Sequence, residues 1–158
     1  MQCRALPVRV KPHYGRGTFE DFMNAISHHA ALVYIMVVVS ASDGNMSERE
    51  LRTIGDIVRT LPVFQGFDES RLLAVSKECA EIVQEEDGLD AVLGLIRNAL
   101  PESLRETAYW LALEVALSDS LVRVEEVRIV ELLRRSLGID RLVAAALDRA
   151  AEARFRAA

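Results

Sequence analysis

Two acidic pairs with the same spacing are the residues of this sequence that could do chemistry. Asp43 and Glu50 lie seven positions apart, and Asp119 and Glu126 repeat this spacing further along the chain. Four carboxylates that met without a cation would repel one another, and carboxylate oxygens are ligands that hard divalent ions prefer. If the two pairs converge, we expect Asp43, Glu50, Asp119 and Glu126 to bind a divalent cation. Ca²⁺ is favoured, and Mg²⁺ or another ion is the alternative.

Each of these acidic residues also has a structural role that its local sequence predicts. Ser47 and Glu50 have the S-x-x-E spacing of a capping box, in which each side chain binds a free backbone N–H of a new helix. Glu126 has the equivalent third position of another predicted helix, where negative charge suits the helix dipole. Asp43 and Asp119 could make turn hydrogen bonds, although a carboxylate at the end of a helix opposes the dipole. The sequence leaves the caps and the cation site open as alternatives.

Two helix–turn–helix units must position these carboxylates. In the first unit, an apolar run over residues 30–39 leads through Gly44 into an amphipathic stretch over residues 51–61. Gly44 supplies the positive φ that commonly ends a helix. Aligning Ser42–Asp43 with Ser118–Asp119 also superposes the apolar residues that follow each pair. This self-similarity predicts a pseudo-symmetric internal pair of units.

At these motifs the sequence resembles a known family. Residues 34–51, YIMVVVSASDGNMSEREL, resemble the TerB tellurite-resistance family, as does the second Asp…Glu copy, and the likeness covers about residues 19–147. The resemblance implies a bacterial, all-helical domain with an acidic, metal-binding centre. It therefore implies a role in the response to tellurite or metal stress.

The second copy departs from the family pattern at two positions. Ser120 stands where the family has the glycine of its Asp-Gly pair, and Arg123 stands where the first copy has the capping Ser47. An arginine three residues before Glu126 could neutralise that carboxylate in place of a metal. Arg123 is therefore an alternative partner for Glu126 in the second half-site.

Composition and periodicity predict the fold class. The chain has 158 residues, of which 51% are hydrophobic, and this length suits one well-buried core. Helical periodicity, short joints and the lack of alternating stretches predict an all-α bundle of about seven helices. The expected helices cover about residues 18–42, 47–61, 69–85, 89–100, 101–117, 124–137 and 140–155. Leu72, Leu73, Val75 and Ile82 are expected on the buried side of the third helix, and the loop at residues 61–67 is expected to fold over the core.

Charge and apolar patterning bear on location and partners. The formal charge of −5 argues against nucleic-acid binding, and the two cysteines fit a reduced, cytoplasmic setting. The apolar run at residues 30–39 is shorter than the roughly 20 residues that a transmembrane helix needs. Residues 1–17 carry four basic and no acidic side chains, which predicts a flexible basic arm before a helical domain over residues 18–158. The arm either touches anionic lipid or an acidic partner, or is solvated without a partner.

Motifs for catalysis are missing from the sequence. It has no phosphate-binding glycine loop, no H-E-x-x-H and no C-x-x-C, and its three histidines fall within the first 29 residues. An EF-hand fails on spacing, since counting from Asp43 puts Glu48 where the invariant glycine belongs. We therefore expect no enzyme. Together with the resemblance, which implies the stress response, the carboxylate pattern predicts a cation-binding, cytoplasmic stress-response module with protein partners, peripheral to the inner membrane if the arm binds there. The alternative is a metal-free helical module that holds a protein through its acidic face or through residues 63–67.

Overall fold

The computed structural model describes residues 26–41, 46–118 and 124–157. Within these ranges the chain forms seven α-helices, three short 3-10 helices and no strand, which confirms the all-α prediction. In chain order the elements are α2 (His28–Ser40), α3 (Glu48–Thr60), η2 (Pro62–Phe64), η3 (Glu69–Arg71), α4 (Leu72–Val83), α5 (Gly88–Ala99), η4 (Glu102–Leu104), α6 (Arg105–Leu117), α7 (Val124–Leu137) and α8 (Arg141–Arg154).

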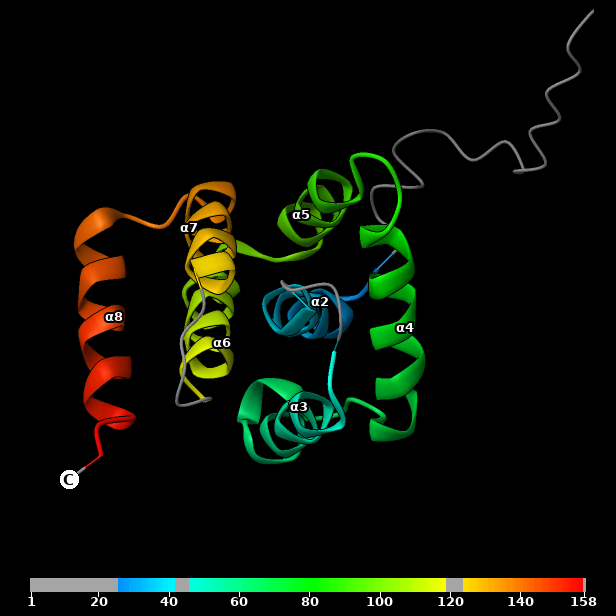
Figure 1. Ribbon diagram of the computed structural model, residues 1–158, viewed down its shortest axis with the longest axis horizontal. Coiled ribbons are helices and arrows are strands. Elements are labelled where there is room, and N and C mark those ends of the chain that lie inside the picture. Colours follow the sequence, from blue (N-terminus) through cyan, green and yellow to red (C-terminus); the bar gives the residue numbers. More distant parts are fainter. Residues whose placement is uncertain (1–25, 42–45, 119–123, 158) are drawn as a thin grey trace, which may run out of the picture.

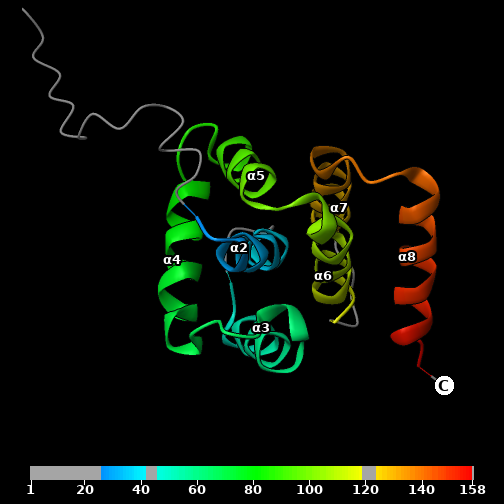
Figure 2. The same ribbon diagram turned by 180° about the vertical axis from the view of Figure 1, so that it is seen from behind.

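Helix α2 is the centre of the bundle. Figures 1 and 2 show it surrounded by α3, α4, α5 and the α6–α7 pair, with α8 on the outer side of that pair. Ten consecutive residues of α2, from Ala31 to Ser40, are buried. A helix enclosed on all sides needs no polar face, which explains why its sequence is apolar all round.

Helix α6 repeats the character of α2. Eight of its thirteen residues are buried, and it leads into the amphipathic α7 as α2 leads into the amphipathic α3. Helix α2 packs against α6 and α7, and α3 contacts α6. The two predicted helix–turn–helix units are therefore present as α2–α3 and α6–α7, with their buried helices in contact.

Several helix ends lie where local sequence signals predict them. Asp140 caps α8, since its Oδ1 accepts a hydrogen bond from the backbone N–H of Leu142 at 2.8 Å. Helix α7 has the predicted bounds and stops before Gly138, whose φ of 67° is the left-handed conformation typical of a residue that follows a helix. Phe64 is 3% exposed, which confirms that the loop after α3 folds over the core.

The first predicted helix is wrong at its start. The backbone of Ser27 is extended, and the Oγ of Ser27 accepts a hydrogen bond from the N–H of Ala30 at 3.1 Å, so α2 begins at His28. A serine that binds the backbone three residues ahead favours a helix start over the continuation of an earlier helix. Thr18, the expected first residue, and the basic arm of residues 1–17 lie outside the described residues.

Two other helices begin later than predicted. Both the third and the fifth predicted helix open with a 3-10 turn, so α4 begins at Leu72 and α6 begins at Arg105. Leu73 was expected on the buried side of α4, but it is 50% exposed. The buried side runs through Leu72, Val75 and Cys79 at helical spacing, which turns Leu73 outward.

Candidate cation site

Glu50 lies in the first turn of α3. Its Oε2 accepts a hydrogen bond from the N–H of Ser47 at 2.6 Å, and the Oγ of Ser47 accepts one from the N–H of Glu50 at 3.2 Å. The predicted capping box is therefore confirmed, and it satisfies two N–H groups that a helix start leaves without partners. A carboxylate has a second oxygen, so a capping role for Glu50 is compatible with a metal-ligating one.

Glu126 is the third residue of α7, and it is buried. Only 6% of its surface is exposed, whereas its neighbours Glu125 and Val127 are exposed. A buried carboxylate is costly unless it is compensated by hydrogen bonds, an opposite charge or a cation. Glu126 is engaged by other groups in the structure, and the dipole at the start of α7 favours its charge. The position predicted from the repeat is confirmed, and burial distinguishes this glutamate from Glu50.

Asp43 and Asp119 lie outside the described residues, as do Ser120 and Arg123. Helices α2 and α6, which pack against each other, end at Ser40 and Leu117, a few residues before these aspartates. Among the residues that the structure describes, no three His, Cys, Asp or Glu side chains gather as a metal site would require. The convergence of the four carboxylates therefore stays a prediction.

Ser40 is a polar residue near the candidate site that the sequence analysis did not single out. It is the last residue of α2, is 1% exposed, and its Oγ has no hydrogen-bond partner among the described residues. Leaving a buried hydroxyl without a partner costs about 1–3 kcal/mol. No local pattern predicts this, because a helical serine usually bonds a carbonyl of its own helix.

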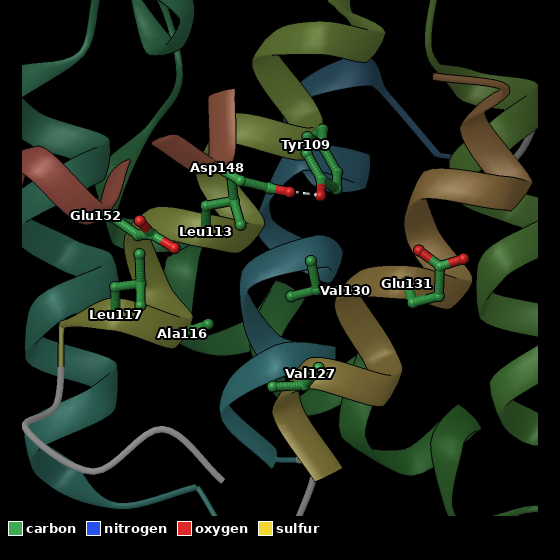
Figure 3. A pocket seen from close by; sticks show the side chains of 9 residues that line it. All are labelled: Tyr109, Leu113, Ala116, Leu117, Val127, Val130, Glu131, Asp148 and Glu152. Carbon is green, nitrogen blue, oxygen red and sulfur yellow. Dashed lines mark hydrogen bonds between the residues drawn. The ribbon is translucent and has the colours of Figure 1, made fainter. Parts of the chain in front are cut away.

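A cavity of about 300 Å³ lies between α6, α7 and α8 (Figure 3). Tyr109 donates a hydrogen bond from its hydroxyl to Asp148 Oδ1 at 2.8 Å, and burial together with this carboxylate raises the pKa of Tyr109. Hydrogen bonds from Arg134 and Arg135 hold the pKa of Glu131 at about 2. Neither Tyr109 nor Glu131 changes protonation near neutral pH, so these two groups are not suited to proton transfer.

The apolar loop that the metal-free alternative offers to a partner packs on the core. Phe64 is buried, and Val63 and Phe67 pack against the core cluster. His29 joins this loop to α2, because its Nε2 lies 3.1 Å from the carbonyl oxygen of Val63 and its ring stacks on Phe64. The loop therefore offers little free apolar surface to a protein.

A model of a known protein family matches most of the chain. The family model described as tellurite resistance protein TerB matches residues 29–149, which are 121 of the 158 residues. No curated protein and no solved structure matches the chain. In the part of the chain that the structure describes, no helix has both the length and the apolar character needed to span a bilayer.

Proposed function

Because the chain belongs to the TerB tellurite-resistance family, we propose that it is a non-enzymatic stress-response module that binds a divalent cation. The proposed ligands are Asp43, Glu50, Asp119 and Glu126. Oxygen ligands of this kind suit Ca²⁺ and Mg²⁺, and we favour Ca²⁺ because carboxylates can bind it in flexible geometry. The cation would stabilise the folded chain rather than take part in a reaction.

The observation that carries this proposal is the repeated unit with a glutamate in the first turn of its second helix. Glu50 in α3 and Glu126 in α7 belong to helices that pack around the same buried pair, α2 and α6. Caps alone would explain a solvent-exposed pair of glutamates. The burial of Glu126 supports the proposal, because a buried carboxylate needs hydrogen bonds, an opposite charge or a cation to compensate it.

Ser40 adds support at the other end of the turn. Its buried hydroxyl can donate a hydrogen bond to a ligating carboxylate and so fix the orientation of that ligand. We expect Ser40→Ala to weaken cation binding by about tenfold to a hundredfold, which is the usual effect of removing a group that orients a ligand. If Ser40→Ala binds the cation with unchanged affinity, the Ser40 hydroxyl does not orient a ligand of the site.

Thermal unfolding of the metal-stripped chain tests the proposal and names the ion. The protein is melted with and without millimolar Ca²⁺, Mg²⁺, Mn²⁺ and Zn²⁺. An ion that binds only the native state at about a hundred times its Kd adds about 2.7 kcal/mol, a shift of several degrees. We expect one ion to raise the Tm of the wild type and to have no effect on Asp43→Asn.

The control for general acidity is Glu86→Gln. Glu86 is exposed and belongs to a second acidic cluster, Glu85–Asp87, at the turn between α4 and α5. This variant should keep the full ion-dependent shift. If Glu86→Gln loses the ion-dependent Tm shift and Asp43→Asn keeps it, the ion binds at the turn between α4 and α5 and the proposed site is wrong. If no ion raises the Tm of the wild type, the four carboxylates act only as helix caps and turn formers.

The cytoplasmic location and the protein partners are also part of the proposal. We propose that the four basic residues of the arm at residues 1–17 bring the protein to a membrane-associated stress complex. Cell fractionation of the full chain and of a variant with the four basic residues changed to glutamine tests this. An equal membrane fraction for both would remove the arm from the proposal.

A further inference from the structure

Helix α8 is held to the bundle by little apolar contact. Figures 1 and 2 show it at the outer edge, with α6 and α7 between it and α2. Nine of its fourteen residues are exposed, and Ala144 and Ala151, which carry single methyl groups, are its buried residues. Val143 and Leu147 are partly buried. Because apolar burial drives helix docking, this narrow stripe supplies only weak attachment.

Two polar contacts supplement that stripe, and we name them the clasps. In the inner clasp, the Tyr109 hydroxyl of α6 donates to Asp148 Oδ1 of α8 at 2.8 Å. In the outer clasp, Glu114 Oε1 of α6 accepts a hydrogen bond from Nε of Arg154 at 2.9 Å and forms an ion pair with Nη2 of Arg154 at 2.7 Å. Arg154 lies beyond residues 29–149, so the family match does not include the outer clasp.

The outer clasp protects a buried charge. Glu114 is 9% exposed, and its Oε2 has no hydrogen-bond partner within the described residues. Arg154 is therefore the cation that compensates this carboxylate when α8 is docked. When α8 undocks, water can hydrate the Glu114 carboxylate, so undocking does not leave a buried charge without compensation.

The space under α8 is not filled. The cavity of about 300 Å³ has an apolar floor from α6 and α7, and α8 contributes Asp148 and Glu152 to its wall (Figure 3). Val127 on this floor is already 57% exposed. Undocking α8 therefore breaks few close contacts, which is the property of a segment that opens at low free energy.

We infer that α8 is a hinged strap, which opens as a unit while α2 to α7 stay folded and so uncovers the α6–α7 face. The hinge is Gly138–Asp140. Gly138 has φ of 67°, and the Asp140 cap lies on the α8 side of the hinge, so it moves with the helix. Ile139 is 7% exposed and its N–H bonds the carbonyl of Arg134 at 3.0 Å, which fixes the α7 side.

Native-state hydrogen exchange of the full chain at low denaturant concentrations tests this inference. We expect the amides of α8 to exchange at least tenfold faster than those of α2, because a helix of fourteen residues is marginal by itself in water and its hydrogen bonds open once it leaves the bundle. The denaturant dependence of α8 exchange should be smaller than that of global unfolding, because undocking one helix exposes less surface than unfolding the whole bundle. The amides of α2 should exchange slowly and with the steep denaturant dependence of global unfolding. Equal rates and equal denaturant dependence in α8 and α2 would show that α8 unfolds only with the bundle, and the strap would be refuted.

Variants then test the clasps. Tyr109→Phe removes one hydrogen bond and should raise α8 exchange about fivefold, the equivalent of a net hydrogen bond. Arg154→Gln leaves the Glu114 carboxylate without its cation in the docked state and should raise the exchange rate of the α8 amides at least tenfold. Exchange of the α2 amides should rise by the same factors, because global unfolding also breaks the clasps. The α8 exchange rate of each variant is therefore compared with that of a control variant rather than with α2.

The matched control is Arg149→Gln. Arg149 pairs with Glu152 at 3.3 Å within α8, and both side chains are more than half exposed, so this pair does not join α8 to α6. Its loss should change α8 exchange by less than about twofold. If Arg149→Gln accelerates α8 exchange as much as Arg154→Gln does, or if neither clasp variant changes it, the clasps do not hold the strap.

Discussion

Replacing Gly88 with alanine tests how closely α4 and α5 are joined. A Cβ at Gly88 would lie 2.0 Å from the carbonyl oxygen of Ile82 and 2.9 Å from the carbonyl carbon and oxygen of Val83. All three are backbone atoms of the end of α4, so no side-chain rotation relieves the contact. The turn itself must open, and α4 and α5 both pack on α2.

The expected cost follows from that collision. Overpacking that displaces backbone typically costs about 1–3 kcal/mol and occasionally more, and because Gly88 is buried we expect about 2–4 kcal/mol. At about 3 °C per kcal/mol for a chain of this size, Tm should fall by about 6–12 °C. The assay is urea and thermal unfolding followed by helical circular dichroism.

Gly94→Ala is the matched control on the same helix. A Cβ at Gly94 meets no atom within 4 Å, so alanine should instead stabilise α5 by about 0.5–1 kcal/mol through its better helix propensity. Opposite signs for the two substitutions are the prediction. A Gly88→Ala protein within 0.5 kcal/mol of wild type (roughly the scatter of surface substitutions) would refute the close approach of the two helices.

Three further predictions concern the core and its edge. Desolvation, and then the charge of His28, lower the pKa of His29, so the folded state binds fewer protons than the unfolded state. The free energy of unfolding should therefore be highest above pH 6.5 and should fall as the pH drops toward the folded-state pKa. Urea midpoints at pH 7.5 and pH 5.5 measure this fall, which should be smaller in His29→Asn. Phe64→Ser should cost about 3–5 kcal/mol, because Phe64 is 3% exposed in the core; a loss below 1 kcal/mol would mean a free loop. Burial raises the pKa of Cys79 to about 12, so thiol labelling of Cys79 followed by mass spectrometry should proceed only at the rate of unfolding, and labelling within minutes in native buffer would contradict its burial.

The elements predicted best are those with a strong signal at both ends. Helix α7 has its predicted bounds, because apolar periodicity defines its buried face and Gly138 ends it in the left-handed conformation. The start of α3 follows in the same way from the Ser47 and Glu50 spacing. Each of these signals acts within a few residues, so the sequence alone carries it.

The misses have a different physical origin. Ser27 can continue a helix or begin one, and the choice depends on where α2 enters the core rather than on neighbouring residues. The Glu114–Arg154 contact joins residues 40 positions apart, so no local pattern announces it. For the candidate site, the sequence identified Glu50 and Glu126 by position. The burial of Glu126, and the lack of a partner for the Ser40 hydroxyl among the described residues, depend on tertiary packing.

The central claim is that one cation is held between two half-sites, one at each helix–turn–helix unit. Equilibrium dialysis of the metal-stripped chain against Ca²⁺ measures this directly, in the wild type, Asp43→Asn and Glu126→Gln, with Glu86→Gln as control. We expect one ion per chain in the wild type and in the control, and loss of that same ion in either half-site variant. Binding of Ca²⁺ that survives both half-site variants, or no binding in the wild type, would contradict the shared site.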